Sequence, residues 1–313
     1  MIPVMKAQTL REGKDDDWWD RPDVVADEKL DGHWCELEAG ERWNTLYSSL
    51  GNDISEQHPW LRDLKLPQGL IVVGEIRVPG GSSNMTNGDV DRAVFTMFDF
   101  LATKTKPYAY MSEEWSRRAE LDNLVLTMDC VRLSVPRRSR FDKRRFYEEI
   151  IEAGGEGVVL KDMHAPYQPG KRSPYWRKRK AWITVDVVIV GCDAPPTMWT
   201  VKPGHYGTDG VFYPEGKPSE PALKGWKNLE YGYWDPVRNA VVKVGSLGYT
   251  GPPDELRQHV GVVAEVKCAG VYTSGAMRHP TKVIFRGDKA AHECTLAAIL
   301  ASAGSQVIKV KGG

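Results

Sequence analysis

The segment Asp27-Glu28-Lys29-Leu30-Asp31-Gly32 joins two stretches that have the composition of β-strands. Residues 24–26 before it are apolar, and residues 33–37 after it also have a strand-like pattern. We therefore expect Lys29 in a turn between two strands, where Gly32 permits a backbone shape that other residues resist. A lysine held beside a buried strand becomes a nucleophile when desolvation or nearby positive charge lowers its pKa. Taken alone, so short a motif is better explained as a surface lysine in a hairpin.

The composition limits the class of protein. The chain has 313 residues, which suffices for two domains of ordinary size. With 41% hydrophobic and 27% charged residues, it has the composition of a soluble globular protein. No apolar run approaches the ~20 residues that a membrane helix needs, and residues 1–14 lack the features of a signal peptide. The five cysteines are scattered without zinc-ligand spacing, so we expect free thiols and a cytoplasmic location.

The charges are balanced overall but clustered locally. The formal net charge is zero. Residues 132–145 nevertheless hold seven basic residues against one acid, and residues 171–180 hold six basic residues and no acid. Such clusters permit a phosphate-binding face. A solvated basic loop explains either cluster equally well when it is taken alone.

Apolar runs and turn signals divide the chain into expected elements. Beyond residues 24–37, we expect strands over residues 42–49, 70–78, 93–101, 156–162 and 182–191, and helices over residues 55–64, 113–124 and 141–153. Short strands at residues 240–244, 260–268 and 282–285, before a helix over residues 294–303, suggest a small β-barrel. We place one domain at residues 1–182 and another at residues 183–313. The second has a long loop insertion at about residues 192–235, which are rich in Pro, Gly, Trp and Tyr.

Further residues suit a lysine nucleophile. Glu75 interrupts an apolar strand, and a buried carboxylate there needs a cationic partner; an exposed strand face is the alternative. Phe98, at the end of another apolar strand, either belongs to the core or stacks on a base. Glu156 is at the start of an expected strand. Period-two alternation would place Lys178 and Lys180 on one strand face, where two ammonium groups would lower the pKa of a neighbouring lysine and hold phosphate oxygens.

In this order the residues resemble the motifs of the covalent nucleotidyltransferases, and among them the ATP-dependent DNA ligases. The nucleophile motif Lys-x-Asp-Gly is Lys29-Leu30-Asp31-Gly32, and Asp27 is the acid two positions before the lysine. The Gly-Glu motif is Gly74-Glu75, the Phe-Asp motif is Phe98-Asp99, and the motif that begins Glu-Gly-Val and ends in Lys is Glu156–Lys161.

The resemblance continues to the end of the chain. Arg172 lies six positions before the motif lysine, and Trp-x-Lys-x-Lys is Trp176–Lys180. The last motif, Arg-x-Asp-Lys, is Arg286-Gly287-Asp288-Lys289, and it follows a run similar to Leu-Arg-His-Pro at residues 277–280. Each motif alone is weak, but their common order over residues 27–289 excludes chance agreement.

The resemblance implies an α+β fold. An ATP-grasp-like nucleotidyltransferase domain of antiparallel sheets and helices would precede an OB-fold β-barrel domain. It also implies a ligase that uses ATP and Mg²⁺ to seal nicks in double-stranded DNA, as in the compact ligases of viruses and some bacteria. Lys29 would form a lysine–AMP intermediate, AMP would pass to a 5′-phosphate, and a 3′-hydroxyl would displace it. We expect a monomer that is not attached to a membrane. We expect neither an additional N-terminal DNA-binding domain nor a zinc cluster.

The resemblance also implies residue roles. Glu75 and Glu156 would bind Mg²⁺, Phe98 would stack on adenine, and Asp27 would lie beside the adenine amino group. The implied ATP-binding residues are Asp27, Lys29, Asp31, Glu75, Phe98, Arg172, Lys178 and Lys180. The implied catalytic residues are Lys29, Lys178, Lys180, Arg286, Asp288 and Lys289, the last three from the second domain, where Arg286 and Lys289 would orient pyrophosphate.

Two positions depart from the family pattern. Trp34 and Ser49 stand where many members have an arginine that contacts the ribose or the 5′-phosphate, and Arg42 or Arg77 would have to replace them. In the insertion, aromatic side chains are candidates for a DNA clamp, with a self-packed surface segment as the alternative; they are Trp199, Tyr206, Trp226 and Tyr233.

Three other functions remain open. An mRNA-capping guanylyltransferase shares the nucleophile motif but would prefer GTP, and an RNA ligase usually lacks this barrel with its Arg-x-Asp-Lys motif. A non-catalytic nucleic-acid-binding module would bind DNA without forming a covalent AMP adduct. Glu75 and Glu156 disfavour that module, because carboxylates repel phosphate unless a metal is present.

Overall fold

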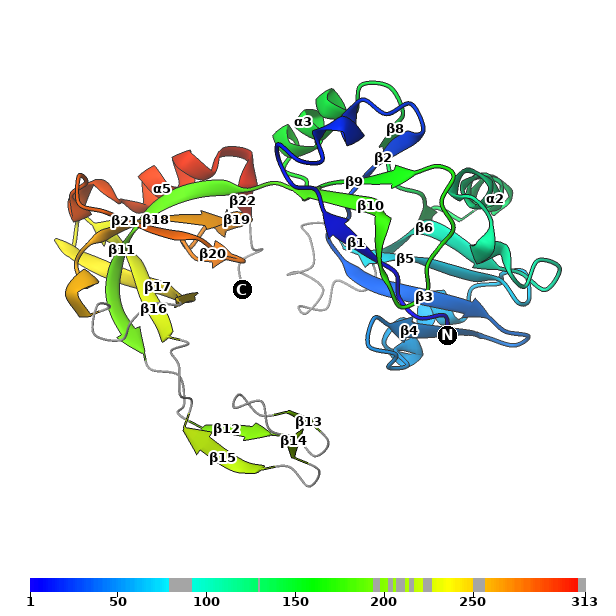
Figure 1. Cartoon of the computed structure of the whole chain (residues 1–313), viewed down its shortest axis with the longest axis horizontal. Helices are drawn as coiled ribbons and strands as arrows, with labels where there is room; N and C mark the ends of the chain where they lie inside the picture. The colour runs from blue at the N-terminus through cyan, green and yellow to red at the C-terminus, as the bar shows by residue number, and fades with distance from the viewer. Residues whose placement is uncertain are drawn as a thin grey trace. The chain divides into compact units, whose positions relative to one another are not determined.

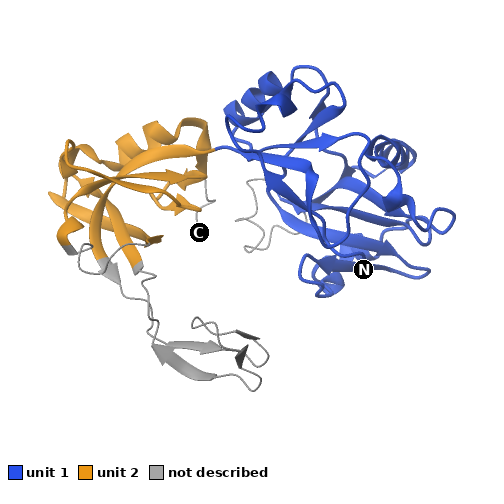
Figure 2. Ribbon diagram, in the orientation of Figure 1, with its two compact units in different colours: residues 1–181, 309–313 blue, residues 182–308 orange. Residues whose placement is uncertain are grey.

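The computed structural model describes residues 1–78, 92–128, 130–193, 198–201, 205–206, 212–213, 217–221, 227–249 and 257–308. The chain forms two compact units, residues 1–181 and residues 182–308 (Figure 2). Within the described residues, no helix has the length and apolar character required to cross a membrane.

The first unit contains two five-stranded sheets (Figure 1). In spatial order, sheet 1 comprises β1 (Lys6–Thr9), β10 (Arg172–Lys180), β9 (Gly157–Asp162), β2 (Val24–Glu28) and β8 (Arg138–Ser139). Sheet 2 comprises β4 (Asn44–Ser48), β3 (His33–Ala39), β5 (Ile71–Arg77), β6 (Val94–Ala102) and β7 (Leu133–Ser134). The helices are α1 (Pro59–Arg62), α2 (Glu114–Thr127) and α3 (Lys143–Glu152), with 3₁₀ turns η1 (Asp16–Trp19), η2 (Ser55–Gln57) and η5 (Ala109–Met111).

The sheets pack face to face because both carry apolar residues on the facing sides. Val73 and Leu101 of sheet 2 share a buried cluster with Trp176 of sheet 1. Successive strand residues point to opposite faces. The other face of sheet 2 therefore packs in a separate cluster with α2, and the other face of sheet 1 packs against Phe146 and Ile150 of α3.

The second unit is built on an antiparallel sheet. In spatial order it comprises β17 (Ala240–Tyr249), β16 (Lys227–Asp235), β11 (Ile183–Asp193), β18 (Val263–Cys268) and β21 (Val283–Arg286). Smaller sheets comprise β20 (Met277–Arg278), β19 (Gly270–Tyr272) and β22 (Val307–Ile308), the pair β12 (Met198–Val201) and β15 (Lys217–Pro221), and the pair β13 (His205–Tyr206) and β14 (Phe212–Tyr213). The remaining elements are α5 (Leu296–Ala303), η6 (Arg257–His259), η7 (Ala291–Glu293) and η8 (Gly304–Gln306).

The core of this unit lies between its main sheet and α5, where Ile299 and Ala303 join the strand residues Val185 and Tyr231. In the described residues of this unit, sheets and a helix pack together, and the strands do not close into a barrel. The predicted OB-fold barrel therefore stays a prediction.

The predicted loop at residues 192–235 contains regular structure. Its last part is β16, a strand of the main sheet in which Leu229 and Tyr231 are buried. Tyr233, a clamp candidate, packs against the core of the second unit. The side chains of the other candidates, Trp199, Tyr206 and Trp226, lie outside the described residues.

Candidate active site

Lys29 follows the last residue of β2 in sheet 1, and the chain continues into β3 in sheet 2. The two strands therefore do not form a hairpin, and the segment at residues 29–32 crosses from one sheet to the other. The Lys29 amide donates to the Gly157 carbonyl at 2.8 Å, which ties the crossing to β9. A Cβ at Gly32 would lie 2.4 Å from the Ile76 carbonyl oxygen. Gly32 is thus needed for close approach to β5, not for the unusual backbone shape that we expected.

One carboxylate connects two lysines at this crossing. Glu156 Oε2 lies 2.5 Å from Lys29 Nζ, and Glu156 Oε1 lies 2.7 Å from Lys180 Nζ. The Glu156 side chain is only 9% exposed. The arrangement therefore concentrates two positive charges around one negative charge in a poorly hydrated place, where their interaction is stronger than in water.

Lys178 lies on the same face of β10 as Lys180, because the two residues are separated by one position of a regular strand. Burial lowers the pKa of the half-buried Lys178, and the neighbouring charges of Lys180, Lys29 and Arg172 lower it further. Three lysines thus share one electrostatic environment. Lys29 is one of the positively charged residues that lower the pKa of Lys178.

Glu75 faces the same environment from β5. Burial raises the pKa of Glu75 to about 7; the positive charge of Lys29 opposes this shift, and the negative charges of Glu156 and Asp31 reinforce it. A cation between the carboxylates would relieve this cost. The donor atoms are oxygens, which Mg²⁺ prefers, so the residues fit that ion with water and phosphate as its other ligands. The described side chains include no group of three or more acidic, His or Cys residues arranged to hold a metal.

Asp27 is buried in a charge network. Its two oxygens accept from Arg118 at 2.7 and 2.9 Å, and Lys161 Nζ lies 3.0 Å from Oδ2. Burial by itself would raise the pKa of Asp27, but Arg118 and Lys161 outweigh this effect and hold the pKa well below its usual range. The carboxylate therefore stays ionised inside the protein.

The sequence reasoning missed most of this network. Glu114 and Arg117 on α2 extend it, since Arg117 pairs with Asp99 at 2.7 Å and with Glu114 at 2.5 Å. Arg118 lies 3.1 Å from Glu114 on the same helix. The spacing of these charges places them on one helix face, but a charged helix face usually indicates solvent exposure.

Phe98 and Arg172 occupy different surroundings. The half-buried Phe98 ring packs edge-on against Trp176 with the centroids 6.2 Å apart, and the Phe98 carbonyl accepts from Lys161 at 2.8 Å. Arg172 is exposed and donates to the Ala7 carbonyl at 2.9 Å. Phe98 is thus fixed by buried contacts, whereas the exposed guanidinium of Arg172 contacts a backbone carbonyl of β1.

The two positions without the family arginine lie on β3 and after β4. Trp34 is paired with Glu75 across the β3–β5 ladder and packs into the cluster between the sheets. Of the two substitutes, Arg77 lies beside the crossing, because its Cγ is 2.8 Å from the place of a Cβ on Gly32. Its Nη1 is 4.0 Å from Glu28 Oε1, whereas Arg42 is exposed in the β3–β4 connection.

The Arg-x-Asp-Lys residues belong to the second unit. Arg286 donates to both oxygens of Asp288 at 2.8 and 2.7 Å. Lys289 Nζ lies 2.7 Å from Asp186 Oδ2. The hydrogen bond to Asp186 raises the pKa of Lys289. Both cations therefore have acidic partners within their own unit.

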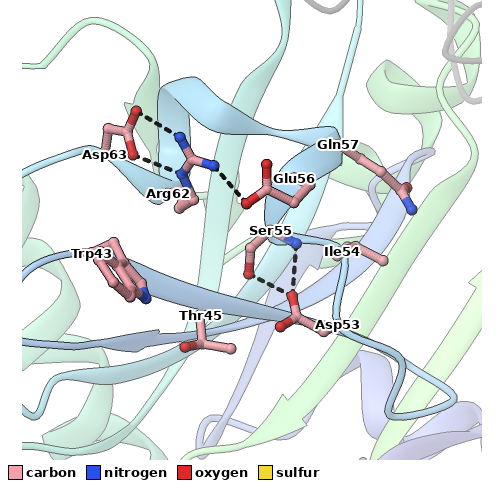
Figure 3. A pocket seen from close by; sticks show the side chains of 9 residues that line it. All are labelled: Trp43, Thr45, Asp53, Ile54, Ser55, Glu56, Gln57, Arg62 and Asp63. Atoms are coloured by element: carbon pink, nitrogen blue, oxygen red, sulfur yellow. Dashed lines mark hydrogen bonds and ion pairs between the residues drawn. The ribbon is translucent and has the colours of Figure 1, made fainter.

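A cavity of about 460 Å³ lies elsewhere on the first unit, over β4, η2 and α1 (Figure 3). It contains none of the predicted ATP-binding residues. Arg62 pairs there with Glu56 and Asp63, and Asp53 accepts from Ser55. The excess of carboxylates would repel a triphosphate, so we exclude this cavity as the nucleotide site.

Residues 81–180 match the family model of the ATP dependent DNA ligase domain. The matched segment spans 100 of the 313 residues. The crossing that carries Lys29 precedes the matched residues. The chain is also similar to curated proteins, of which it spans less than a quarter of the length. The multifunctional non-homologous end joining DNA repair protein LigD of Mycobacterium tuberculosis (strain H37Rv) is 30% identical over 172 residues, covering 52% of this chain and 22% of that protein. A DNA ligase of Archaeoglobus fulgidus is 32% identical over 146 residues, covering 45% of this chain and 22% of that protein.

Solved structures share the fold of this chain. The ligase domain from M. tuberculosis LigD has a TM-score of 0.51 at 22% identity, covering 94% of this chain and 98% of that chain. A Lig E DNA ligase has a TM-score of 0.63 at 16% identity, covering 91% of this chain and 100% of that chain. The mixed α/β sheets thus have the architecture of ATP-dependent ligases.

Proposed function

We propose that the chain is an ATP-dependent DNA ligase that seals nicks in duplex DNA through a covalent adenylate on Lys29. The observation that carries this proposal is the carboxylate of Glu156 between Lys29 and Lys180, at 2.5 and 2.7 Å. The match of residues 81–180 to the ligase domain supports the reaction class.

In the first step, the Lys29 amine attacks the α-phosphorus of ATP, an N–P bond forms, and the bond to pyrophosphate breaks. A free lysine titrates near ~10.4, so Lys29 must lose its proton before attack. The ammonium groups of Lys178 and Lys180 hold phosphate oxygens. Glu156 must release Lys29 for this step, because its carboxylate stabilises the protonated amine.

Glu75 and Glu156 are the residues that would hold Mg²⁺. When bound, the ion supplies positive charge against the phosphate oxygens. Phe98 stacks on the adenine, and Asp27 with its partners keeps the base end of the site in place. Asp31 and Arg172 complete the set of ATP-binding residues. Arg286 and Lys289 orient the pyrophosphate, and their ion pairs with Asp288 and Asp186 must be exchanged for it. Asp288 is the acid of the same catalytic motif.

The later steps join DNA. AMP passes from Lys29 to a 5′-phosphate at a nick, and the neighbouring 3′-hydroxyl then displaces AMP to form the phosphodiester. We place the adenylation domain at residues 1–182 and an OB-fold domain at residues 183–313, acting as a monomer. A cytoplasmic location is part of the proposal. It is supported by the free thiols of the cysteines with described side chains, Cys35, Cys130, Cys268 and Cys294.

Self-labelling tests the proposal. Wild-type protein incubated with α-labelled ATP and Mg²⁺ should acquire label, Lys29→Ala should acquire none, and the exposed-lysine control Lys65→Ala should match wild type. Label on the Lys29→Ala protein would reject the assignment. Labelling by GTP in preference to ATP would instead favour a capping guanylyltransferase, and sealing of nicked RNA but not nicked DNA would favour an RNA ligase.

A further inference from the structure

A group of arginines lies on the first unit where β8 leads into α3 (Figure 1). Its members are Arg137, Arg138, Arg140, Arg144 and Arg145, and all are exposed except the half-buried Arg138. A cavity of about 530 Å³ is lined by three of these arginines together with Phe141. We call these five arginines and Phe141 the β8–α3 surface.

The β8–α3 surface has an excess of positive charge. Arg138 pairs with Asp122, and Arg145 pairs with Glu149. The other three, Arg137, Arg140 and Arg144, form no ion pair with any residue that the structure describes. Three positive charges are therefore available to an anionic partner.

The β8–α3 surface is held in place from beneath. The buried Lys143 donates to the carbonyls of Arg21 and Arg140 at 3.0 and 3.3 Å. The Asp142 side chain caps α3 by accepting from the Arg145 amide at 2.9 Å. Because the backbone is fixed in this way, the arginines need less ordering when a partner binds.

Aromatic rings add to this pattern. The Arg144 guanidinium lies 5.3 Å from the Trp19 ring, and the Arg137 guanidinium lies 5.7 Å from the Phe146 ring. Phe141 is 93% exposed at the edge of the cavity. Positive charge combined with an exposed aromatic ring is typical of surfaces that bind a nucleic-acid backbone.

The β8–α3 surface begins beside the nucleophile strand. In the β2–β8 ladder, Arg138 is paired with Asp27, and the Glu28 amide donates to the Arg137 carbonyl at 2.8 Å. Arg137 thus lies one strand away from the residue that precedes Lys29. When the 5′-phosphate of a DNA strand reaches Lys29, the next phosphates of that strand can contact this surface.

We propose that the β8–α3 surface binds phosphates of the DNA duplex beside the nick. This inference rests on the proposed ligase function and assigns part of its DNA-binding area. The proposed contacts are to the sugar–phosphate backbone of the DNA, so they add affinity and position the duplex without selecting a base sequence.

Binding of a nicked duplex in EDTA, measured by fluorescence anisotropy at several salt concentrations, tests the proposal. The variant Arg140→Gln/Arg144→Gln should lower the affinity about tenfold at low salt. Each phosphate contact contributes about 0.9 to the slope of log affinity against log salt, so the slope should fall by about 1.8. Phe141→Ser should weaken binding without changing the slope. The matched control Lys65→Gln/Lys104→Gln removes the same charge from exposed lysines on another part of the first unit and should keep both values.

Self-adenylation needs no DNA, so the arginine variant should label at the wild-type rate, which also shows that it is folded. Sealing of pre-adenylated nicks should slow at low DNA concentration and recover at saturation. Unchanged affinity and slope in the arginine variant, or an equal loss in the lysine control, would overturn the proposal. Failure of wild-type protein to self-label would instead contradict the ligase function, independently of the DNA-binding comparison.

Discussion

Lys29 and Lys180 contact opposite oxygens of the Glu156 carboxylate, at 2.5 and 2.7 Å. Glu156 is the residue before β9, Lys29 is the residue after β2, and Lys180 is the last residue of β10. Three neighbouring strands of one sheet thus bring these groups together. The geometry makes Glu156 both a restraint on the Lys29 amine and a candidate metal ligand.

Glu156→Gln should therefore lower self-adenylation by at least about 10- to 100-fold, the loss that is typical even of outer-shell contacts in metal sites. The neutral amide still fills the space but binds Mg²⁺ poorly. The rate of label incorporation should be measured over a range of Mg²⁺ concentrations, with Glu152→Gln on the exposed face of α3 as the control. A wild-type rate for Glu156→Gln at low Mg²⁺ would be incompatible with this role.

Glu75 should make the stability of the protein depend on pH. Its pKa is raised from 4.5 to about 7 in the folded chain. Between these values the folded state binds more protons than the unfolded state, so stability falls as pH rises through this interval. Glu75→Gln removes the cost of the buried charge. The variant should be more stable than wild type at pH 8, by at most about 3 kcal/mol, and nearly equal to it at pH 4.5.

Urea denaturation without Mg²⁺ at both pH values measures this difference. Burial also raises the pKa of Glu36 to about 7, but that group is present in both proteins and cancels in the comparison. Added Mg²⁺ should stabilise wild type more than Glu75→Gln if Glu75 is a ligand. A difference between the two proteins that does not change with pH would contradict the assigned pKa.

Local patterns predicted the strands that carry the site, because their apolar runs have the length and composition of buried strands. They did not predict β1, since three of its four residues, Lys6–Thr9, are polar and none is fully buried. They also missed the partner of Asp27. Arg118 is 91 residues away in sequence, and its helix carries so many charges that it suggests a solvated element.

Two features of the crossing could not be determined from local sequence. A strand, a short connection and another strand have the same local pattern whether they form a hairpin or pass between sheets. Only the pairing of β2 with β9 and of β3 with β5 distinguishes these cases. The need for Gly32 likewise depends on Ile76 of β5, which lies 44 residues further along the chain and approaches Gly32 only in the folded structure.

Arg118→Ala should destabilise the first unit by about 3–5 kcal/mol, because it leaves Asp27 without its bidentate partner in a buried site. Asp27→Asn in the same protein should recover part of this loss, since it removes the unpaired charge. The free energy of unfolding of both variants measures the coupling. Arg145→Ala breaks an exposed pair with Glu149 and should cost less than about 1 kcal/mol. An Arg118→Ala protein as stable as Arg145→Ala would show that the network contributes little.

Arg286→Ala should impair self-adenylation, the first step, without impairing nick sealing, the last step. Arg286 is held by Asp288 in the second unit, and its proposed partner in catalysis is the pyrophosphate group, which takes part only in adenylation. Removing one charge-stabilising donor typically costs about 100- to 1,000-fold in rate, so self-labelling with ATP should fall by that factor. Sealing of a pre-adenylated nick should stay within a few-fold of wild type. Arg238→Ala, which removes an exposed arginine paired with Asp235 in the same unit, is the matched control and should keep both activities. Equal losses of labelling and sealing in Arg286→Ala would mean that this residue also acts on DNA, and unchanged labelling would remove it from the site.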